Sequence, residues 1–312
     1  MNMKEKLKKT IKKHPNLYSS IKNIDGYSRW YLNKLLRYLP EKHRFYRKTG
    51  YWPDLKEPRS FNEKVLWKKI NDRNPLLPVT ADKHRVRSYV KEVLGEEKAE
   101  EILIPQLFVT DDPEEIPFED LPEDFVVKAN HGSGTNRIIR NGDFDREKLI
   151  KECKRWLKTP YGLGKLEWAY QEIDRKIIVE KLIKNEEGKI PKDYKFYIFH
   201  RECELIHIDF GRYKNHKRTF FDANWNYLPI SLGYPKESKV NEPENLEKII
   251  NIAEELGQKF DFVRVDLYSV DEKIYFGELT HYPGSGMKKF KPKSFDFELG
   301  ENWDIEKEYW KD

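Results

Sequence analysis

One segment, residues 262–280, constrains the fold more than any other part of the chain. Two strand-like runs flank a polar turn at residues 269–273, and this pattern predicts a β-hairpin. Successive side chains of a strand point to opposite faces. The first run therefore places Arg264 and Asp266 on one face and its apolar residues, Val263, Val265 and Leu267, on the other.

The charged face of this hairpin brings two carboxylates together. In the second run, Phe276, Glu278 and Thr280 are expected to share a face. Pairing across a turn centred near residues 271–272 places Asp266 opposite Glu278 or one diagonal step away, about 5 to 8 Å between Cβ atoms. Two carboxylates this close repel each other unless a cation lies between them. Oxygen ligands without His or Cys indicate Mg²⁺, although an Arg264 side chain bridging two surface acids is the alternative.

A second signal is a loop of small residues that follows a short β-branched run at residues 125–128. The loop spans residues 130–136 and contains Gly132, Ser133, Gly134 and Thr135. Glycines allow a backbone to approach phosphate closely, the hydroxyls offer donors, and Lys128 adds a positive charge. Because the loop lacks the ending of a P-loop, an ordinary Gly-Ser turn is the alternative interpretation.

Elsewhere the chain mixes helical and strand-like patterns, which favours an α+β fold. Helices are expected at residues 61–70, 81–94 and 244–260, and behind Asp145; further strands are expected at residues 177–179, 196–199 and 205–210. Clusters of turn-forming residues divide the chain into regions 1–50, 51–120, 121–183 and 184–312. His207 and Asp209 share a face of one of the strands and could be taken for metal ligands, but two such residues without a third more often form a hydrogen-bonded surface pair, which is the expectation here.

The first region is strongly basic, with 14 Lys/Arg against 3 Asp/Glu in residues 1–50. Apolar and basic residues interleave there as in a basic amphipathic helix. Such an arm could dock on an anionic membrane surface or an acidic polymer, or it could pack against its own domain with a solvated basic face. The remaining residues are net acidic, which argues against a nucleic-acid-binding module and against nucleic acid as a partner.

The order of the motifs resembles the ATP-grasp superfamily. These motifs are Asp82-Lys83, Lys128 with its loop, Val179-Glu180-Lys181-Leu182-Ile183, Arg264-x-Asp266 and Glu278-x-Thr280. Three further segments look like the TupA-like branch, which is named for teichuronopeptide biosynthesis: Ser60-Phe61-Asn62-Glu63-Lys64, Asp193-Tyr194-Lys195-Phe196 and Phe276-Gly277-Glu278-Leu279-Thr280. The resemblance extends from about residue 46 to about residue 303 and leaves only the basic arm outside.

The resemblance implies two α+β subdomains that clasp ATP, preceded by the basic helical arm of residues 1–50. Residues 51–120 would form a substrate-side region, 121–183 a lid subdomain with the Gly-rich loop, and 184–312 a C-terminal subdomain with the magnesium site. The residues implied to bind ATP are Lys83, Lys128, Gly132, Ser133, Gly134, Thr135, Glu180, Lys181, Leu182, Ile183 and Asp193, and those implied to bind Mg²⁺ are Asp266, Glu278 and Thr280. Thr280 stands where most of the superfamily has Asn.

The remaining site residues are implied by the same resemblance. Arg264 is expected to act in catalysis, together with Lys195 or Arg212, while Lys217 and Arg218 fit the phosphate-contacting cation less well. His281 and Ser285 come after the metal strand and could touch the acyl acceptor, as could their neighbours Tyr282 and Lys288, or they could belong to a plain loop.

The function implied is an ATP- and Mg²⁺-dependent carboxylate–amine ligase that forms an acyl phosphate. In the TupA-like branch, an amide joins an amino acid or peptide to a uronic acid of a cell-surface polysaccharide. A glycosyltransferase or a sugar kinase is the alternative enzyme class. Two unpaired cysteines and the absence of any bilayer-length apolar run predict a cytoplasmic protein, either free or peripheral at the inner face of the membrane.

Overall fold

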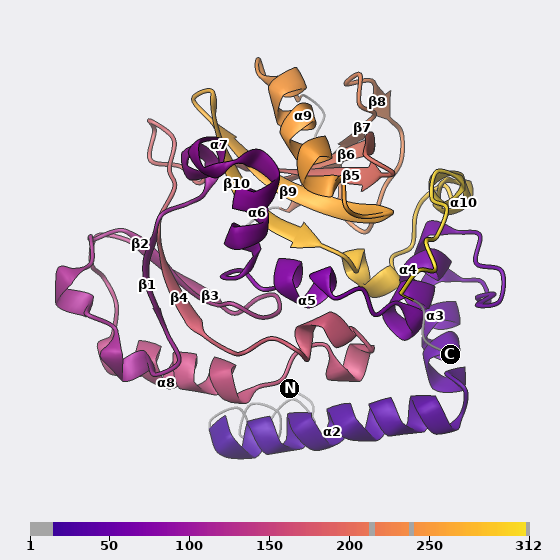
Figure 1. Ribbon diagram of the computed structural model, residues 1–312, viewed down its shortest axis with the longest axis horizontal. Helices are drawn as coiled ribbons and strands as arrows, with labels where there is room; N and C mark the ends of the chain where they lie inside the picture. Colours follow the sequence, from indigo (N-terminus) through magenta and orange to yellow (C-terminus); the bar gives the residue numbers. More distant parts are fainter. Residues whose placement is uncertain (1–14, 212–215, 237–239, 310–312) are drawn as a thin grey trace. The chain divides into compact units, whose positions relative to one another are not determined.

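The computed structural model describes residues 15–211, 216–236 and 240–309 of the chain, coloured in Figure 1. The first 14 residues of the expected basic arm and the candidate Arg212 lie outside these ranges. The chain forms two compact units, which are described separately. Over the described residues, unit 1 comprises residues 15–40, Asp82–His84 and Pro105–Leu182, and unit 2 comprises Glu41–Ala81, Arg85–Ile104 and the described residues from Ile183 onward. Both units mix helices with antiparallel sheet, which confirms the α+β prediction.

Unit 1 is built on a four-stranded antiparallel sheet with the order β1-β4-β2-β3. The strands are β1 (Gln106–Thr110), β2 (Phe125–Ala129), β3 (Asn136–Ile139) and β4 (Ile177–Lys181). Helix α8 (Arg146–Lys158) begins at Asp145, whose side chain caps the backbone N–H of Lys148. Leu149, Cys153 and Trp156 recur along one face of this helix and enter the core beneath the sheet. Short turns of 3₁₀ helix, η1 (Pro113–Glu115), η2 (Phe118–Asp120), η3 (Leu163–Lys165) and η4 (Trp168–Tyr170), complete the unit.

The long helix α2 (Pro15–Leu35) also belongs to unit 1 and contacts η3 and α8. Gly26 lies on the inner face of α2, where a Cβ would meet the Leu163 side chain at 3.1 Å. The opposite face of α2 carries exposed aromatic and aliphatic side chains. The expected amphipathic helix is therefore present over the described part of the arm, with an apolar stripe that points to solvent.

Unit 2 contains a six-stranded antiparallel sheet with the order β10-β9-β5-β6-β7-β8. The strands are β5 (Lys192–Phe199), β6 (Glu202–Phe210), β7 (Lys217–Phe221), β8 (Tyr227–Leu228), β9 (Phe262–Val270) and β10 (Lys273–Thr280). Helix α9 (Leu246–Gly257) covers one face, and there Ile198 lies so near Gly257 that a Cβ on the glycine would meet it at 2.6 Å. Close packing of α9 on the apolar face leaves the opposite face of the sheet for polar groups.

On that opposite face, helix α4 (Phe61–Asn71) inserts Phe61 among the rings of Tyr197, Phe262 and Trp303. A complete capping box between Ser60 and Glu63 fixes the start of α4. The other helices of this unit are α3 (Leu39–Thr49), most of it in unit 2, α5 (Leu76–Ala81), α6 (Val86–Leu94), α7 (Glu96–Ile102), η5 (Pro283–Gly286) and α10 (Ser294–Glu301). The helix expected at residues 81–94 begins only at Val86, as α6; Ala81 is the last residue of α5, and the segment between the two helices contains Lys83.

The hairpin expected from the sequence is confirmed, with Val270 paired to Lys273 across a turn at residues 271–272. One detail of the prediction is wrong. A β-bulge at Gly277 pairs Phe276 with Leu267 on the apolar face, so Phe276 does not share a face with Glu278. The extra residue shifts the register of the rest of β10 and places Glu278 directly opposite Asp266.

Within the described residues, no helix combines the length and the apolar character that crossing a membrane requires.

Candidate active site

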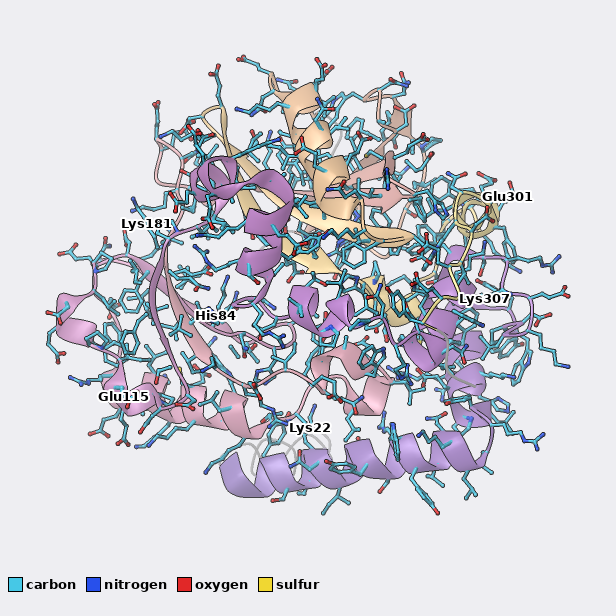
Figure 2. All side chains as sticks on the ribbon, viewed as in Figure 1. Lys22, His84, Glu115, Lys181, Glu301 and Lys307 are labelled. Carbon is cyan, nitrogen blue, oxygen red and sulfur yellow. The ribbon has the colours of Figure 1, made fainter. Side chains whose placement is uncertain are left out.

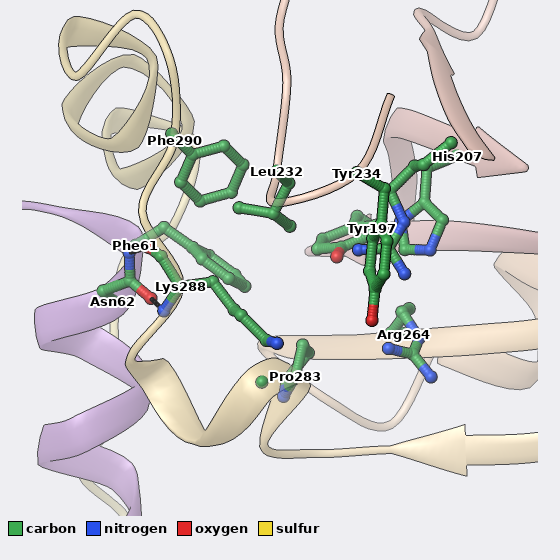
Figure 3. A pocket seen from close by; sticks show the side chains of 12 residues that line it. Phe61, Asn62, Tyr197, His207, Leu232, Tyr234, Arg264, Pro283, Lys288 and Phe290 are labelled. Carbon is green, nitrogen blue, oxygen red and sulfur yellow. Dashed lines mark hydrogen bonds between the residues drawn. The ribbon is translucent and has the colours of Figure 1, made fainter. Parts of the chain in front are cut away.

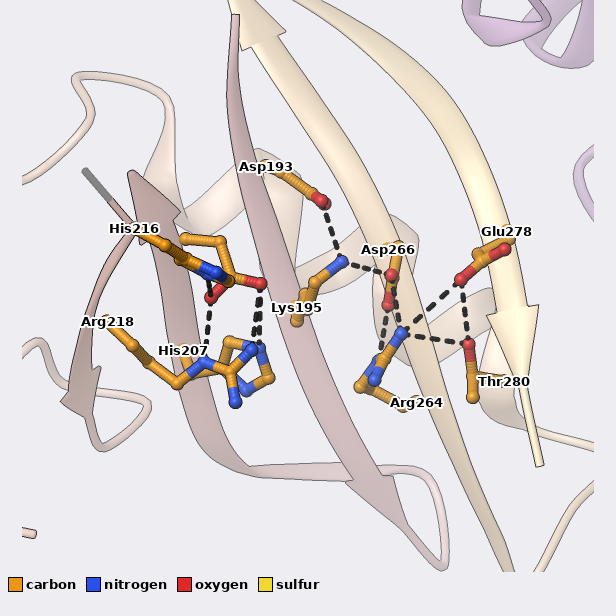
Figure 4. Close-up of polar contacts among 10 residues, drawn as sticks. Asp193, Lys195, His207, His216, Arg218, Arg264, Asp266, Glu278 and Thr280 are labelled. Atoms are coloured by element: carbon orange, nitrogen blue, oxygen red, sulfur yellow. Dashed lines mark hydrogen bonds and ion pairs between the residues drawn. The ribbon is translucent and has the colours of Figure 1, made fainter. Parts of the chain in front are cut away.

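A row of charged side chains crosses five strands on the α4 side of the sheet in unit 2 (Figure 4). Directly paired residues of an antiparallel sheet share a face, and the register pairs Glu278 with Asp266, Asp266 with Lys195, and Lys195 with His207. The members of the row are Glu278 and Thr280 on β10, Arg264 and Asp266 on β9, Asp193 and Lys195 on β5, His207 and Asp209 on β6, and Arg218 on β7. The row forms two clusters.

The first cluster centres on Arg264. Its Nε donates to Oδ1 of Asp266 at 2.6 Å and its Nη2 to Oδ2 at 2.7 Å, a two-pronged pairing that fixes both side chains. The same Nη2 lies 2.9 Å from the Thr280 hydroxyl and 3.4 Å from Oε1 of Glu278. Burial disfavours the charged guanidinium, but the Asp266 carboxylate outweighs burial and raises the pKa of Arg264. Arg264 is therefore a permanent positive charge between two carboxylates.

Lys195 enters this cluster from the neighbouring strand and is buried. Its Nζ donates to Oδ2 of Asp193 at 2.8 Å and also contacts Oδ2 of Asp266. Asp266 consequently lies between two cations, Arg264 and Lys195, whereas 38% of the Glu278 side chain is exposed to solvent. The two carboxylates differ in their surroundings, and Glu278 is the one that an incoming ligand can reach.

The oxygen donors of the first cluster fit Mg²⁺. Asp266 and Glu278 face each other across β9 and β10, with the Thr280 hydroxyl 3.2 Å from Oε1 of Glu278. No group of three or more His, Cys, Asp or Glu side chains suited to a metal occurs among the described residues. Mg²⁺ needs no such group, because it binds through one or two protein carboxylates and completes its shell with water and phosphate.

The phosphate loop predicted from the sequence lies in unit 1. It connects β2 to β3, and both of its glycines adopt positive φ, +77° at Gly132 and +78° at Gly134. Lys83 reaches the loop from outside the sheet, since its Nζ donates to the carbonyl oxygen of Gly132 at 2.6 Å. The structure thus brings Lys83, far away in sequence, onto the loop that comes after Lys128.

The remaining unit 1 candidates lie around the end of β4. Lys128 forms an ion pair with Glu180 at 2.5 Å, and both side chains are largely buried. Lys181, the last residue of β4 and labelled in Figure 2, is exposed, and Leu182 is buried. Ser133 is exposed, Thr135 is half-buried and accepts a backbone bond from Ala129, and Ile183 begins the next part of unit 2.

Two predicted substrate residues have hydrogen-bond partners outside the charged row. His281 is buried, with Nε2 2.7 Å from the Thr80 hydroxyl and its ring packed on Phe260, and burial lowers the pKa of His281 to about 3. Ser285, in the turn after β10, accepts a hydrogen bond from Lys69 at 3.1 Å. Arg212 lies outside the described residues, and Lys217 precedes Arg218 on β7 and therefore points to the other face of the sheet.

The second cluster was not expected from the sequence. His207 and Asp209 were expected on the surface, but both side chains are buried, because β6 lies inside the sheet between β5 and β7. Arg218 donates to the Asp209 carboxylate from Nε to Oδ1 at 2.7 Å and from Nη2 to Oδ2 at 3.0 Å. Nε2 of His216 lies 2.9 Å from Oδ1 of the same carboxylate. The sequence does contain a signal for this cluster, because His207-x-Asp209 and His216-x-Arg218 each place two polar side chains on one face. This signal can be interpreted only when β6 is known to pair with β7.

Comparison with protein families gives one match, to the family described as TupA-like ATPgrasp, over residues 63–304. No curated protein matches the chain. Similar solved structures include a D-alanine–D-alanine ligase from Bacillus anthracis, at 17% identity and a TM-score of 0.40 over 68% of this chain and 60% of that one. Another is the Helicobacter pylori D-alanine–D-alanine ligase, at 13% identity and a TM-score of 0.42 over 78% and 69%.

A third similar structure is the ATP-grasp ligase PsnB complexed with a variant of its minimal precursor, Mg and ADP. It is 11% identical, with a TM-score of 0.37 over 66% of this chain and 52% of that one. The chain therefore spans between about half and two thirds of the length of these structural neighbours.

Proposed function

Because the chain belongs to the TupA-like ATP-grasp family, we propose that it uses ATP to join a substrate carboxylate to an amine through an acyl phosphate. The family and superfamily expected from the sequence are confirmed, and the ligase activity is what we propose from this membership. Its substrates are our proposal: the carboxylate belongs to a uronic acid of a cell-surface polysaccharide, and the amine belongs to an amino acid or peptide.

The observation that carries this proposal is the direct pairing of Asp266 with Glu278, with Arg264 and Lys195 beside them. Asp266, Glu278 and the Thr280 hydroxyl would hold Mg²⁺, which neutralises phosphate charge when bound. Arg264 and Lys195 would then stabilise the charge that develops on the transferred phosphoryl group.

In unit 1, Lys83 and Lys128 would neutralise nucleotide phosphates, and the backbone N–H groups of residues 132–135 would hydrogen-bond them. Residues 180–183, at the end of β4, would line the adenine site. Asp193 would contribute to nucleotide binding by accepting a hydrogen bond from Lys195 and so positioning it. These roles are assigned from the positions of the family motifs in this chain.

The chemistry needs positioned charge rather than a nucleophilic side chain. The substrate carboxylate attacks the γ-phosphorus of ATP, ADP leaves, and the amine then displaces phosphate from the acyl phosphate. Both thiols of the chain are unsuited to nucleophilic work, because burial raises the pKa of Cys153 to about 12 and raises that of Cys203 as well.

ADP release, measured with a panel of uronic acids and amino acids, tests this function. Hydroxylamine added to the reaction should trap the acyl phosphate as a hydroxamate. We expect ADP release that depends on both an acid and an amine, and its loss in Asp266→Asn and in Glu278→Gln. Consumption of a nucleotide sugar, or a phosphate left on the acceptor, would instead identify a glycosyltransferase or a sugar kinase, and would refute the ligase.

We further propose that helix α2 docks on an anionic membrane surface. Ile24, Tyr27, Tyr31 and Leu35 recur at helical spacing and form one stripe, and each side chain is 63–65% exposed. The basic side chains of the arm suit an anionic surface, while the apolar stripe suits the lipid interior and has no role on an acidic polymer. Docking would place the enzyme beside lipid-linked acceptors.

Sedimentation with lipid vesicles tests this docking. The full chain should bind vesicles that contain phosphatidylglycerol more tightly than vesicles of phosphatidylcholine alone. The triple variant Tyr27→Ser, Tyr31→Ser, Leu35→Ser should lose binding, whereas Tyr227→Ser, which removes an exposed ring from unit 2, should not. Equal binding by the triple variant and the wild type, or binding of a soluble polyanion alone, would contradict membrane docking.

A further inference from the structure

A pocket opens on the same face of the unit 2 sheet, next to Arg264 (Figure 3). The cavity is small, about 90 Å³, and opens partly to solvent, so it can take a carboxylate and the carbon atoms next to it while the rest of a larger ligand lies outside. The side chains around it come from β5, β6, β7, β9, α4, the segment after β8 and the segment after β10. Several of the lining residues are already named from the sequence, namely Arg264, Arg218, His207, Lys288 and the motif residues Phe61 and Asn62, but their convergence on one pocket was not predicted.

Among the residues that the structure describes, the charged groups that line the pocket are all cationic: Arg218, Arg264 and Lys288. Arg218 donates to Asp209, and Arg264 to Asp266, in each case through Nε and Nη2. The Nη1 group of each arginine does not take part in these two pairings. An anionic group is the ligand that this lining favours.

His207 supplies a second, independent indication of a ligand. Its side chain is only 1% exposed, it lines the pocket, and neither ring nitrogen has a hydrogen-bond partner among the described residues. Asp209 is 3.7 Å away, too far for a hydrogen bond. Burial lowers the pKa of His207, so the ring is neutral and offers one N–H donor. Buried polar groups are rarely left unpaired, and a ligand oxygen in the pocket would satisfy this one.

The backbone of Lys288 is held in place by Asn62 of helix α4. The Asn62 amide donates to the Lys288 carbonyl oxygen at 2.8 Å and accepts from the Lys288 N–H at 3.2 Å. The stem of Lys288 passes over Gly284, where a Cβ would meet it at 2.3 Å, and Gly284 adopts a positive φ of +58°. The contacts with Asn62 and Gly284 therefore fix the backbone and the stem of Lys288, and its side chain lines the pocket, as Figure 3 shows.

The rest of the pocket wall is aromatic and aliphatic, formed by Phe61, Leu232, Tyr234 and Phe290. The Tyr234 ring stacks on His216 with centroids 3.7 Å apart, and the Arg218 guanidinium lies 5.0 Å from its centre. The second cluster thus fixes the Arg218 guanidinium and the Tyr234 ring, both of which line the pocket.

We infer that this pocket binds the acid substrate of the ligase, an inference that rests on the proposed function. Its carboxylate is recognised by Lys288, Arg218 and the N–H of His207, and its carbon skeleton packs on the aromatic wall. Arg264 belongs both to this pocket and to the first cluster, and so connects the acid to the residues proposed to hold Mg²⁺.

Chemical protection of Lys288 tests the pocket without any turnover. The full chain is acetylated with N-hydroxysuccinimidyl acetate, alone or with each acid of the panel, for example glucuronate or glutamate, and modification is measured by mass spectrometry. We expect at least one acid to slow modification of Lys288 severalfold. Its uncharged amide, glucuronamide or glutamine, should not, and Lys289, the exposed neighbour, should react equally throughout. Protection of neither lysine, or of both equally, overturns the inference.

Steady-state kinetics gives the second measurement. Lys288→Met should raise KM for the acid roughly tenfold or more, as expected for a lost charge-assisted hydrogen bond, with KM for ATP unchanged. Lys289→Met is the matched control and should behave like the wild type. A raised KM for ATP in place of the acid would overturn the inference.

The two proposals can fail separately. If the wild type releases ADP but Lys288→Met leaves KM for the acid unchanged, the pocket assignment falls and the ligase function stands. If the wild type releases no ADP with any acid while an acid still protects Lys288, the ligase function falls and the pocket remains an anion site.

Discussion

The unequal surroundings of the two carboxylates predict different effects on stability when each is neutralised. Asp266→Asn and Glu278→Gln should both abolish ADP release, since each removes a proposed magnesium ligand. In Asp266→Asn, two cations that are almost completely shielded from water, Arg264 and Lys195, lose a shared partner. Glu278 is 38% exposed and lies at 3.4 Å from Arg264, a weaker contact.

The expected cost is set by these contacts. Removing one partner of a buried ion pair costs about 3–5 kcal/mol. Lys195 keeps Asp193 at 2.8 Å and Arg264 keeps the Thr280 hydroxyl, so we expect the lower end, about 3 kcal/mol. Glu278→Gln should cost below about 1 kcal/mol, because solvent screens its carboxylate. At about 2–4 °C per kcal/mol for a chain of this size, Asp266→Asn should lower Tm by about 6–12 °C.

Differential scanning fluorimetry of the wild type and both variants at one pH and salt concentration measures this difference, with ADP release assayed on the same preparations. Asp266→Asn should melt well below the other two, while Glu278→Gln should melt close to the wild type and be inactive. Equal Tm values for the two variants, or wild-type stability in Asp266→Asn, would refute the view that Asp266 holds the two cations in place.

Three further predictions concern the loop, the buried histidine and the bulge. Gly132→Ala should raise KM for ATP more than Gly134→Ala does. Both substitutions strain a positive φ, but only at Gly132 would the added Cβ also meet an aromatic ring, that of Tyr161, at 2.5 Å. Equal KM values for the two variants would contradict this. Since the pKa of His281 falls from 6.5 to about 3 on folding, the unfolded chain binds more protons below pH 6.5, and stability should fall by about 2 kcal/mol by about pH 5. Urea unfolding of His281→Gln should show a smaller loss over that interval, and an unchanged loss would refute the assignment. Gly277→Val should reduce ADP release strongly, because a Cβ there would meet a backbone oxygen at 2.9 Å and force the bulge to shift; full activity would show that the bulge does not set the register of the site.

Much of the fold could be predicted because its signals are local. The capped helix behind Asp145, the strands around residues 125–128 and 177–179 and the hairpin at residues 262–280 all depend on periodicity and turn chemistry within a few residues. Strand β7 and the break between α5 and α6 were not predicted, because pairing with distant segments decides them.

In the candidate site, too, some features have local sequence signals and others depend on contacts between distant segments. The residue types that carry the chemistry could be predicted from the sequence, because Arg264-x-Asp266 and Glu278-x-Thr280 alternate onto one face of their strands and the motif order indicated the family. Their surroundings depend on how the whole chain packs: a bulge at Gly277 sets Glu278 opposite Asp266, and His207 is buried beside a cationic pocket. Strand alternation is a property of a few consecutive residues, whereas burial and register depend on which distant strands lie alongside, and that choice is made by the packing of the whole sheet.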